Sequence, residues 1–413
     1  MMKYEKFTLD NGLQVVVHED HSTKVAVLNV LYDVGSRDED ENKTGFAHLF
    51  EHLMFGGSIH IPSYDEPLQK VGGENNAFTT PDYTNYYISI PSNNLETAFW
   101  LESDRMLSLA FDPQSLEVQR KVVIEEFKQR YLDQPYGDAW LNMKPMAYKV
   151  HPYRWNTIGK EISHIEDATM EDVKSFFNKF YIPNNAILVV AGDVTVGQVR
   201  QLCEKWFAPI ASGADYRRDL PQEPAQEECR EQTVVGNVPM DAFYRAYHMP
   251  DRLDERYHAI DLLSDILGRG KSSRLYTALV KRYNLLNSIG ASITGSVEAG
   301  LLVISGKLKE GVTFEEVDRI VDEEIDRLLK EGLEPEELDK VKMQAESSHV
   351  FSEVELLNRA MSLAYYTLLG DTELVNKETL AINAVTEEEL LAEAKKMLSK
   401  INCSTLYYKR KEA

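Results

Sequence analysis

The chain has 413 residues, of which 43% are hydrophobic and 27% are charged, a balance typical of a globular protein large enough for two domains. It contains no apolar run of about eighteen residues, which excludes an ordinary membrane-spanning helix. The formal net charge of −22 argues against binding to the phosphate backbone of nucleic acids, and it would attract cationic ligands such as basic peptides.

The N-terminal segment and the cysteines indicate the compartment. Residues 1–10 have no apolar core and no small-residue cleavage site, so they do not resemble a secretory signal. Cys203, Cys229 and Cys403 have no metal-binding spacing, which fits a reducing environment. We therefore expect a cytoplasmic protein, or a periplasmic one if a signal peptide has been removed.

The segment Thr44–Gly57 contains two histidines and a glutamate in the order His48-x-x-Glu51-His52. Apolar residues recur around them at helical spacing, and two glycines end the pattern. In a helix both histidines project from one face with the glutamate beside them, so they can bind one Zn²⁺. Catalytic zinc leaves a position for a water whose proton needs a base. The pattern predicts a zinc hydrolase with Glu51 as the base; the alternative is an amphipathic helix with two solvated histidines.

Two later segments have polar residues in positions that suit a substrate or a metal. Asn76–Thr80 follows two glycines and is compatible with an exposed edge strand to which an extended peptide could add, or with a plain turn before a strand. Glu125 and Glu126 interrupt the otherwise apolar end of a helical pattern, and a carboxylate beside a buried face is costly unless it is paired or on a metal. From spacing alone, a solvated pair of glutamates is the more ordinary interpretation.

The sequence predicts two copies of one domain. A polar, proline-containing stretch without periodicity reads as a linker at 212–229, between a first domain at 1–211 and a second at 230–413. The two halves match in register at several places, as expected of an internal duplication. The zinc motif falls on Asp261-Leu-Leu-Ser-Asp265 and Glu126 falls on Ser348, so the second copy keeps no ligand set.

Each copy reads as an α+β layer, a mixed or antiparallel sheet with helices packed on one face. The strand segments are rich in β-branched and aromatic residues. In the first copy they are Gln14–Val17, Val25–Tyr32, Tyr86–Ile90 and Ile187–Ala191.

Several motifs together resemble one family. They are the His-x-x-Glu-His segment, Asn76–Thr79 before Tyr86-Tyr87, Asp104-Arg-Met106, His151-Pro-Tyr153 and Ala191-Gly-Asp193. This set, which extends over essentially the whole chain, resembles the pitrilysin/insulinase inverzincins, in particular the short bacterial relatives of mitochondrial processing peptidase. The resemblance implies a zinc endopeptidase acting on short unfolded peptides, in which two chains or two half-chains close around the substrate.

The resemblance also implies roles for individual residues. In the family the last zinc ligand is a glutamate seven positions after a Glu-Arg pair; here that pair is Gln119-Arg120, so Glu126 is the ligand and Glu125 its neighbour. The amide at Gln119 departs from the acid that often orients the site. The segment Asn76, Ala77, Phe78 and Thr79 corresponds to the substrate-binding strand of relatives.

One expected element of the family is absent. Relatives use an Arg and a Tyr on the second domain to grip the scissile carbonyl, and the matching positions are Val280 and Asn287. Arg282 and Tyr283 are adjacent to each other and do not fit the pattern. We therefore expect a heterodimer in which a homologous subunit supplies the Arg/Tyr pair. The alternatives are a self-sufficient homodimeric peptidase and a non-catalytic, structural or peptide-binding subunit.

Overall fold

The computed structural model describes residues 1–412, and these form two compact units. Unit 1 consists of Met1–Phe127, Trp155–Leu220 and Val350–Lys377. Unit 2 consists of Lys128–Arg154, Pro221–His349 and the residues from Glu378 onward. Each unit thus includes a segment from the other half of the sequence. The boundaries 1–211, 212–229 and 230–413 describe the repeat along the sequence, and they stay a prediction about that repeat.

Unit 1 is built on a six-stranded sheet in the order β1-β2-β6-β3-β5-β4. Its strands are β1 (Glu5–Thr8), β2 (Gln14–Glu19), β3 (Val25–Tyr32), β4 (Glu74–Thr79), β5 (Thr84–Pro91) and β6 (Ala186–Gly192). The β2–β6 pair is parallel and the other neighbouring pairs are antiparallel. The four strands expected in this half are all present, and the parallel β2–β6 pair makes the sheet mixed, which is one of the two arrangements predicted.

The order of the strands follows from their side chains. Strand β6 is apolar along its whole length and every residue in it is buried, as expected of a central strand covered on both faces. Strand β4 has the sequence Glu-Asn-Asn-Ala-Phe-Thr and none of its residues is fully buried. It pairs on one side with β5 and forms an edge of the sheet. A polar strand at an edge leaves backbone groups available for another chain.

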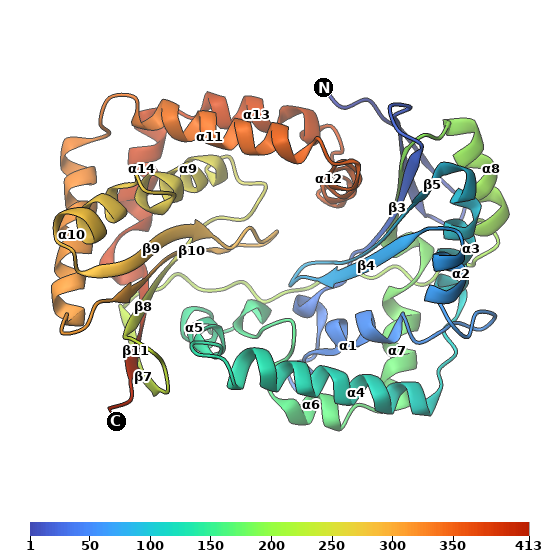
Figure 1. Cartoon of the computed structure of the whole chain (residues 1–413), viewed down its shortest axis with the longest axis horizontal. Helices are drawn as coiled ribbons and strands as arrows, with labels where there is room; N and C mark the ends of the chain where they lie inside the picture. Colours follow the sequence, from blue (N-terminus) through green and yellow to red (C-terminus); the bar gives the residue numbers. More distant parts are fainter. Residues whose placement is uncertain (413) are drawn as a thin grey trace. The chain divides into compact units, whose positions relative to one another are not determined.

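Helices cover both faces of this sheet. The helices of unit 1 are α1 (Phe46–Leu53), α2 (Asp65–Lys70), α3 (Leu95–Leu107), α4 (Pro113–Phe127), α6 (Ile162–Glu166), α7 (Met170–Phe180), α8 (Val196–Trp206) and α12 (Leu356–Leu368), with short turns η1 (Ser36–Asp38), η2 (Ser92–Asn94) and η5 (Pro183–Asn185). Helix α12 comes from the second half of the sequence and packs on β3 and β6. Figure 1 shows α12 on one side of β3, with α3 and α8 on the other.

The α12 face has a continuous apolar core. Val27 and Leu31 alternate along β3 with residues of the opposite face, and Val189 continues their row on β6. Ala360 and Leu363 of α12 pack on them, and all five residues are buried. The first half of the chain alone would leave this face of the sheet uncovered.

Unit 2 repeats the topology of unit 1 with one strand fewer. Its sheet has the order β7-β11-β8-β10-β9, with β7 (Arg230–Gly236), β8 (Ala242–His248), β9 (Leu286–Ile293), β10 (Leu301–Leu308) and β11 (Cys403–Arg410). The β7–β11 pair is parallel and the others are antiparallel. Without β1, the first sheet has the same order and the same strand directions. The two-domain α+β fold predicted from the sequence is therefore confirmed, except that helices cover both faces of the first sheet where the sequence predicted them on one face.

The second sheet also takes a helix from the other half of the sequence. Unit 2 contains α5 (Ala139–Ala147), α9 (Tyr257–Gly268), α10 (Phe314–Glu331), α14 (Glu387–Met397), η3 (Lys128–Leu132), η4 (Pro152–Arg154), η6 (Tyr276–Arg282) and η7 (Lys400–Asn402), while α11 (Glu337–Ser352) and α13 (Leu374–Ala384) contain residues of both units. Helix α5, from the first half, packs on β8 and β11 (Figure 1). Met143 of α5 lies in a buried cluster with Ala246 and Leu406. The two halves thus exchange one helix each.

The predicted linker is bound to both units rather than free. In unit 1, Arg218 donates to the carboxylates of Asp33 and Asp38 at 2.8 and 2.7 Å. In unit 2, Glu223 accepts three backbone N–H groups from residues 149–151 at 2.7–3.0 Å, and the buried Gln226 donates to Cys403 O. Among residues 1–412, no helix is both long and apolar enough to cross a membrane.

Candidate metal centre

Helix α1 contains the His-x-x-Glu-His motif, and a buried carboxylate holds its N-terminus. Glu39 accepts the backbone N–H groups of Gly45 at 2.9 Å and Ala47 at 2.8 Å, and the indole N–H of Trp155 at 3.1 Å. A carboxylate at this end of a helix satisfies N–H groups that have no partner within the helix. Burial raises the pKa of Glu39 to about 8, against three hydrogen bonds that favour its charged form.

Gly45 is the residue that lets the chain enter α1. Its φ of 87° lies in the left-handed region, where a side chain is strained. A Cβ at this position would lie 2.6 Å from the carbonyl oxygen of Ile158. The entry to the helix therefore needs glycine for both its backbone angle and its close packing.

The apolar stripe of α1 fixes which way the motif faces. Phe46, Leu49, Phe50 and Leu53 are all buried, and the ring of Phe50 lies 4.5 Å from that of Tyr181. With this face packed inward, the histidines are left only partly buried, at 13% side-chain exposure for His48 and 24% for His52. The helix predicted from the sequence is therefore present, and its polar residues form one side of a site.

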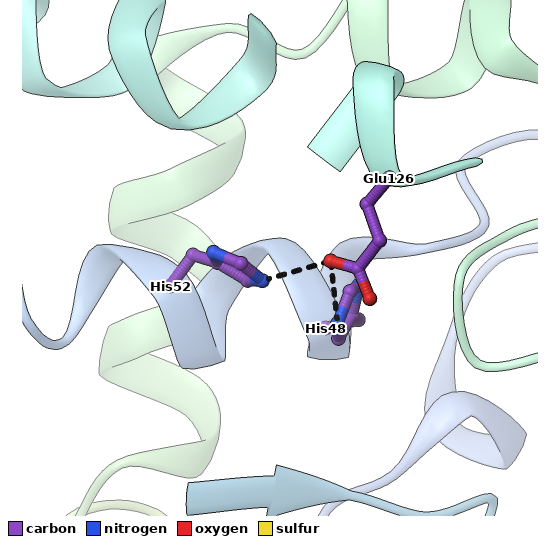
Figure 2. A group of neighbouring side chains, drawn as sticks. All are labelled: His48, His52 and Glu126. Atoms are coloured by element: carbon purple, nitrogen blue, oxygen red, sulfur yellow. Dashed lines mark ion pairs between the residues drawn. The ribbon is translucent and has the colours of Figure 1, made fainter. Parts of the chain in front are cut away.

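Three side chains converge at this site, as Figure 2 shows. The Oε2 atom of Glu126 lies 3.7 Å from His48 Nε2 and 3.5 Å from His52 Nε2. One ligand atom from each residue lies within 4.8 Å of the others. The two imidazoles are nearly perpendicular, with ring centroids 4.8 Å apart. Within residues 1–412 this is the one group of three or more His, Cys, Asp or Glu residues with such spacing.

These distances fit a shared metal better than direct contacts. Two ligands bound tetrahedrally to one Zn²⁺ at about 2.1 Å lie about 3.4 Å apart. Hydrogen-bonded nitrogen and oxygen atoms lie at about 2.7–3.2 Å. The observed 3.5 and 3.7 Å match the first arrangement, and two imidazole nitrogens with one carboxylate oxygen form a donor set that zinc prefers. The residues present therefore fit a zinc ion.

Helix α4 brings Glu126 to the histidines. Leu116, Val123 and Phe127 are buried along one face of α4, and α4 packs on α1. Glu126 is next to that face with 17% of its side chain exposed, whereas Glu125 is turned to the exposed side. Directly after Phe127 the helix widens into the π-helical turn η3, a feature frequently found at functional sites. Of the two glutamates, Glu126 is the one placed with the histidines.

Glu51 is held by a neighbouring strand. Its Oε2 accepts a hydrogen bond of 2.5 Å from the hydroxyl of Thr79, the last residue of β4. Near it are the buried phenols of Tyr86 and Tyr181, whose hydroxyls are 3.1 Å apart. Burial raises the pKa of both phenols, and the nearby charge of Glu51 adds to this effect. This tyrosine layer therefore stays protonated at neutral pH.

Strand β4 contains all four residues expected to contact a substrate. Ala77 lies opposite Tyr86 in the register, and its backbone N–H donates to Asn76 Oδ1 at 2.8 Å. The ring of Phe78 lies 6.0 Å from that of Tyr83. Because side chains alternate along a strand, Thr79 points to the opposite face from Phe78, and that face carries α1.

The equivalent place in unit 2 contains a guanidinium group. Arg269 donates to Asp265 Oδ2 and to Ser348 Oγ, both at 2.8 Å. These are the positions that correspond to His52 and Glu126 in the sequence repeat. Burial raises the pKa of Asp261, the counterpart of His48, to about 6, with Asp265 as the next contributor. The guanidinium of Arg269 therefore links the counterparts of His52 and Glu126, which a metal would link in unit 1.

The positions expected for the Arg/Tyr pair also lie in unit 2. Val280 is in the π-helical turn η6, and Asn287 in β9 donates to Leu308 O at 3.3 Å. Neither has a guanidinium or phenol group. Arg282 lies 3.9 Å from Glu324, and its guanidinium lies over the ring of Tyr283.

The roles of Glu39 and Arg269 and the hydrogen bond of Thr79 do not follow from the sequence. Glu39 lies outside the three-residue spacing of a capping box, so no local rule connects it with α1. An acidic residue shortly before a glycine and a helix is the one signal that could have suggested it. The contacts of Arg269 and Thr79 join segments far apart in the chain, and a single sequence contains no measure of such contacts.

Comparison with known proteins agrees with the motifs and the fold. A family model described as insulinase (peptidase family M16) matches residues 14–142, and one described as peptidase M16 inactive domain matches 167–345. The chain is 32% identical over 355 residues to the zinc protease PqqE of Helicobacter pylori. The aligned region covers 84% of this chain and 80% of that protein. It is 25% identical over 266 residues to a probable mitochondrial-processing peptidase subunit beta of Arabidopsis thaliana. That alignment covers 63% of this chain and 50% of that protein.

A solved structure matches over nearly the whole length. The crystal structure of a protease from Helicobacter pylori has a TM-score of 0.92 and 28% identity, covering 99% of this chain and 100% of that one. The match to PqqE exceeds 30% identity over most of the chain, and the family models match both halves. The chain therefore belongs to the insulinase family of zinc metallopeptidases, peptidase family M16.

Proposed function

We propose that this chain is a zinc-dependent endopeptidase that hydrolyses short unfolded peptides. His48, His52 and Glu126 would hold the zinc ion, and Glu51 would act as the general base. The observation that supports this most directly is the spacing of the three ligand atoms, at 3.5 and 3.7 Å between nitrogen and oxygen. Glu51 is on the same helix three residues after His48, a spacing that puts the two side chains on one side of the helix, and it is not part of the ligand group.

The chemistry divides between the metal and the chain's own residues. Zinc, when bound, lowers the pKa of a water ligand toward about 7 and polarises the substrate carbonyl. Glu51 accepts a proton from the attacking water and delivers it to the nitrogen of the leaving amine. The carboxylate needs a fixed orientation for both transfers, and the hydroxyl of Thr79 is hydrogen-bonded to its Oε2.

Strand β4 is the proposed binding site for the substrate backbone. An extended peptide can add to the open edge of β4 by main-chain hydrogen bonds, which requires that the peptide be unfolded. The N–H of Ala77 donates to the neighbouring Asn76 side chain, and the peptide's carbonyl could take over this hydrogen bond. The same strand ends at Thr79, which contacts the base, so a peptide on β4 would pass Glu51.

Metal analysis with single substitutions tests the assignment. The purified chain should hold about one zinc, and Glu126→Gln or His52→Ala should lose most of it. Glu51→Gln should keep the zinc and lose peptide hydrolysis, because the base is not a ligand. Glu125→Gln is the matched control and should behave like the parent protein. Loss of zinc from Glu125→Gln with retention in Glu126→Gln would exchange the roles of the two glutamates.

We further propose that a homologous subunit completes the active site. The positions expected for the Arg/Tyr pair are Val280 and Asn287, and one relative is named as a subunit of a processing peptidase. Removing a single donor to the developing oxyanion typically costs about 10²–10³ in rate, so the chain alone should be slower than its heterodimer by roughly that factor. Full activity of the purified chain, unaffected by any homologous partner, would favour the self-sufficient homodimer.

A further inference from the structure

We infer that Thr79 is a positioning residue for the general base, and that strand β4 therefore combines the docking of the substrate backbone with the orientation of Glu51. The inference rests on the proposed function, because it assigns Glu51 the role of base. It revises the role that family resemblance gives to Thr79, which is contact with the substrate.

The geometry of the contact supports this role. The Oγ1 of Thr79 lies 2.5 Å from Oε2 of Glu51, a distance typical of a hydroxyl that donates to a carboxylate. A threonine hydroxyl has a single hydrogen to donate. While Thr79 donates to Glu51, it has no hydrogen left to donate to a peptide. The side chain is therefore committed to the base.

The location of Thr79 in the strand explains why such a residue is useful. A glutamate on a helix surface has several rotatable bonds, and holding it in one orientation costs conformational entropy. The strong hydrogen bond from β4 restricts that freedom before the substrate arrives. Because α1 also packs on β4, this strand fixes the position of both the helix and its catalytic side chain.

The same strand is the proposed docking edge for the peptide. Asn76 and Ala77 lie in the same strand as Thr79, with only Phe78 between Ala77 and Thr79, so a peptide hydrogen-bonded to their backbone would be fixed relative to Thr79. The distance between the scissile bond and the base would then be set within one short strand. A substitution at Thr79 should accordingly affect turnover more than binding.

The experiment compares two substitutions at one site. Thr79→Val keeps the shape and removes the hydroxyl, whereas Thr79→Ser keeps the hydroxyl and removes a methyl group. A hydrogen bond to a charged group corresponds to roughly a ten- to hundredfold change in rate. We expect kcat of Thr79→Val to fall by about that factor with KM unchanged, and Thr79→Ser to remain within about threefold of the parent. Thr8→Val, on the exposed edge strand β1 of the same sheet, controls for the type of substitution.

A binding measurement separates positioning from substrate contact. In the Glu51→Gln background, where hydrolysis is blocked, a fluorescent peptide should bind with the same Kd whether residue 79 is Thr or Val. Zinc content should also be the same in both. Any trace of hydrolysis that remains in Glu51→Gln should not fall further when Thr79→Val is added, because the effect of Thr79 passes through Glu51.

Three results would overturn the inference. They are a weakened Kd in the Glu51→Gln/Thr79→Val protein, parental kcat in Thr79→Val, and an equal loss of kcat in Thr79→Ser. Failure of the proposed function itself is seen independently, as retained hydrolysis in Glu51→Gln alone. All turnover is measured under the condition, alone or with a homologous partner, in which the parent protein is active.

Discussion

The exchanged helix α12 leads to a prediction about stability. Leu363 is completely buried against the sheet of unit 1, although it comes from the second half of the sequence. Leu363→Ala removes three buried carbons, which at about 0.8 kcal/mol each corresponds to about 2.4 kcal/mol of transfer free energy. With the cavity that remains, the free energy of unfolding should fall by between about 2.5 and 5 kcal/mol.

The loss should appear in the strands of the first half. In hydrogen exchange, the amides of β3 and β6 should lose protection in Leu363→Ala, because α12 packs on both strands. Met143→Ala in α5 is the matched variant and should instead reduce protection in β8 and β11. Leu380→Ala, at a side chain that is 70% exposed, should change stability by less than about 0.5 kcal/mol.

The opposite pattern of hydrogen exchange would contradict this role of α12. If Leu363→Ala reduced protection in β8 and β11 while β3 and β6 kept theirs, α12 would not be part of the unit that contains the candidate metal centre. If Leu380→Ala lowered the free energy of unfolding as much as Leu363→Ala, burial would not determine the size of these effects.

Three further predictions concern α1 and the net charge. Folding raises the pKa of Glu39 from 4.5 to about 8, so between these pH values the folded state binds more protons and its stability should fall as pH rises. Over that range the stability of Glu39→Gln, measured by urea unfolding, should rise relative to that of the parent protein. A difference between the two proteins that does not change with pH would contradict this. Gly45→Ala should lower the free energy of unfolding by at least about 1 kcal/mol, because its φ is 87° and its Cβ would meet Ile158, and an unchanged melting curve would count against this. With a net charge of −22, binding of basic peptides should weaken as salt shortens the reach of the field to about 8 Å, and a salt-independent Kd would leave the charge without a role.

The sequence predicted those features that depend on local periodicity. The helix around His48 follows from an apolar repeat and a glycine stop, and the structure has it at Phe46–Leu53. The strands follow from short runs of β-branched residues, and the repeat of the fold follows from matches between the halves. Glu126 needed more than periodicity, because its neighbour Glu125 has the same chemistry, and resemblance to a family distinguished the two.

The remaining features depend on contacts between distant segments. No local pattern indicates that α12 packs on β3 and β6, since an apolar helix face is compatible with any apolar sheet. The stretch 212–229 has the composition of a flexible linker, yet Arg218 within it binds residues of unit 1 and Glu223 binds residues of unit 2. The partner of a charged side chain is set by the folded chain, so composition alone could not predict these interactions.

The exchange of helices has a consequence for synthesis on the ribosome. Val27, Leu31 and Val189 are translated long before Leu363, which covers them. During that interval one apolar face of the first sheet remains open to water and to other nascent chains, a state prone to aggregation. The half of this protein that contains the candidate metal centre therefore cannot complete its core until most of the other half has emerged, and fragments that end at the linker should need a chaperone.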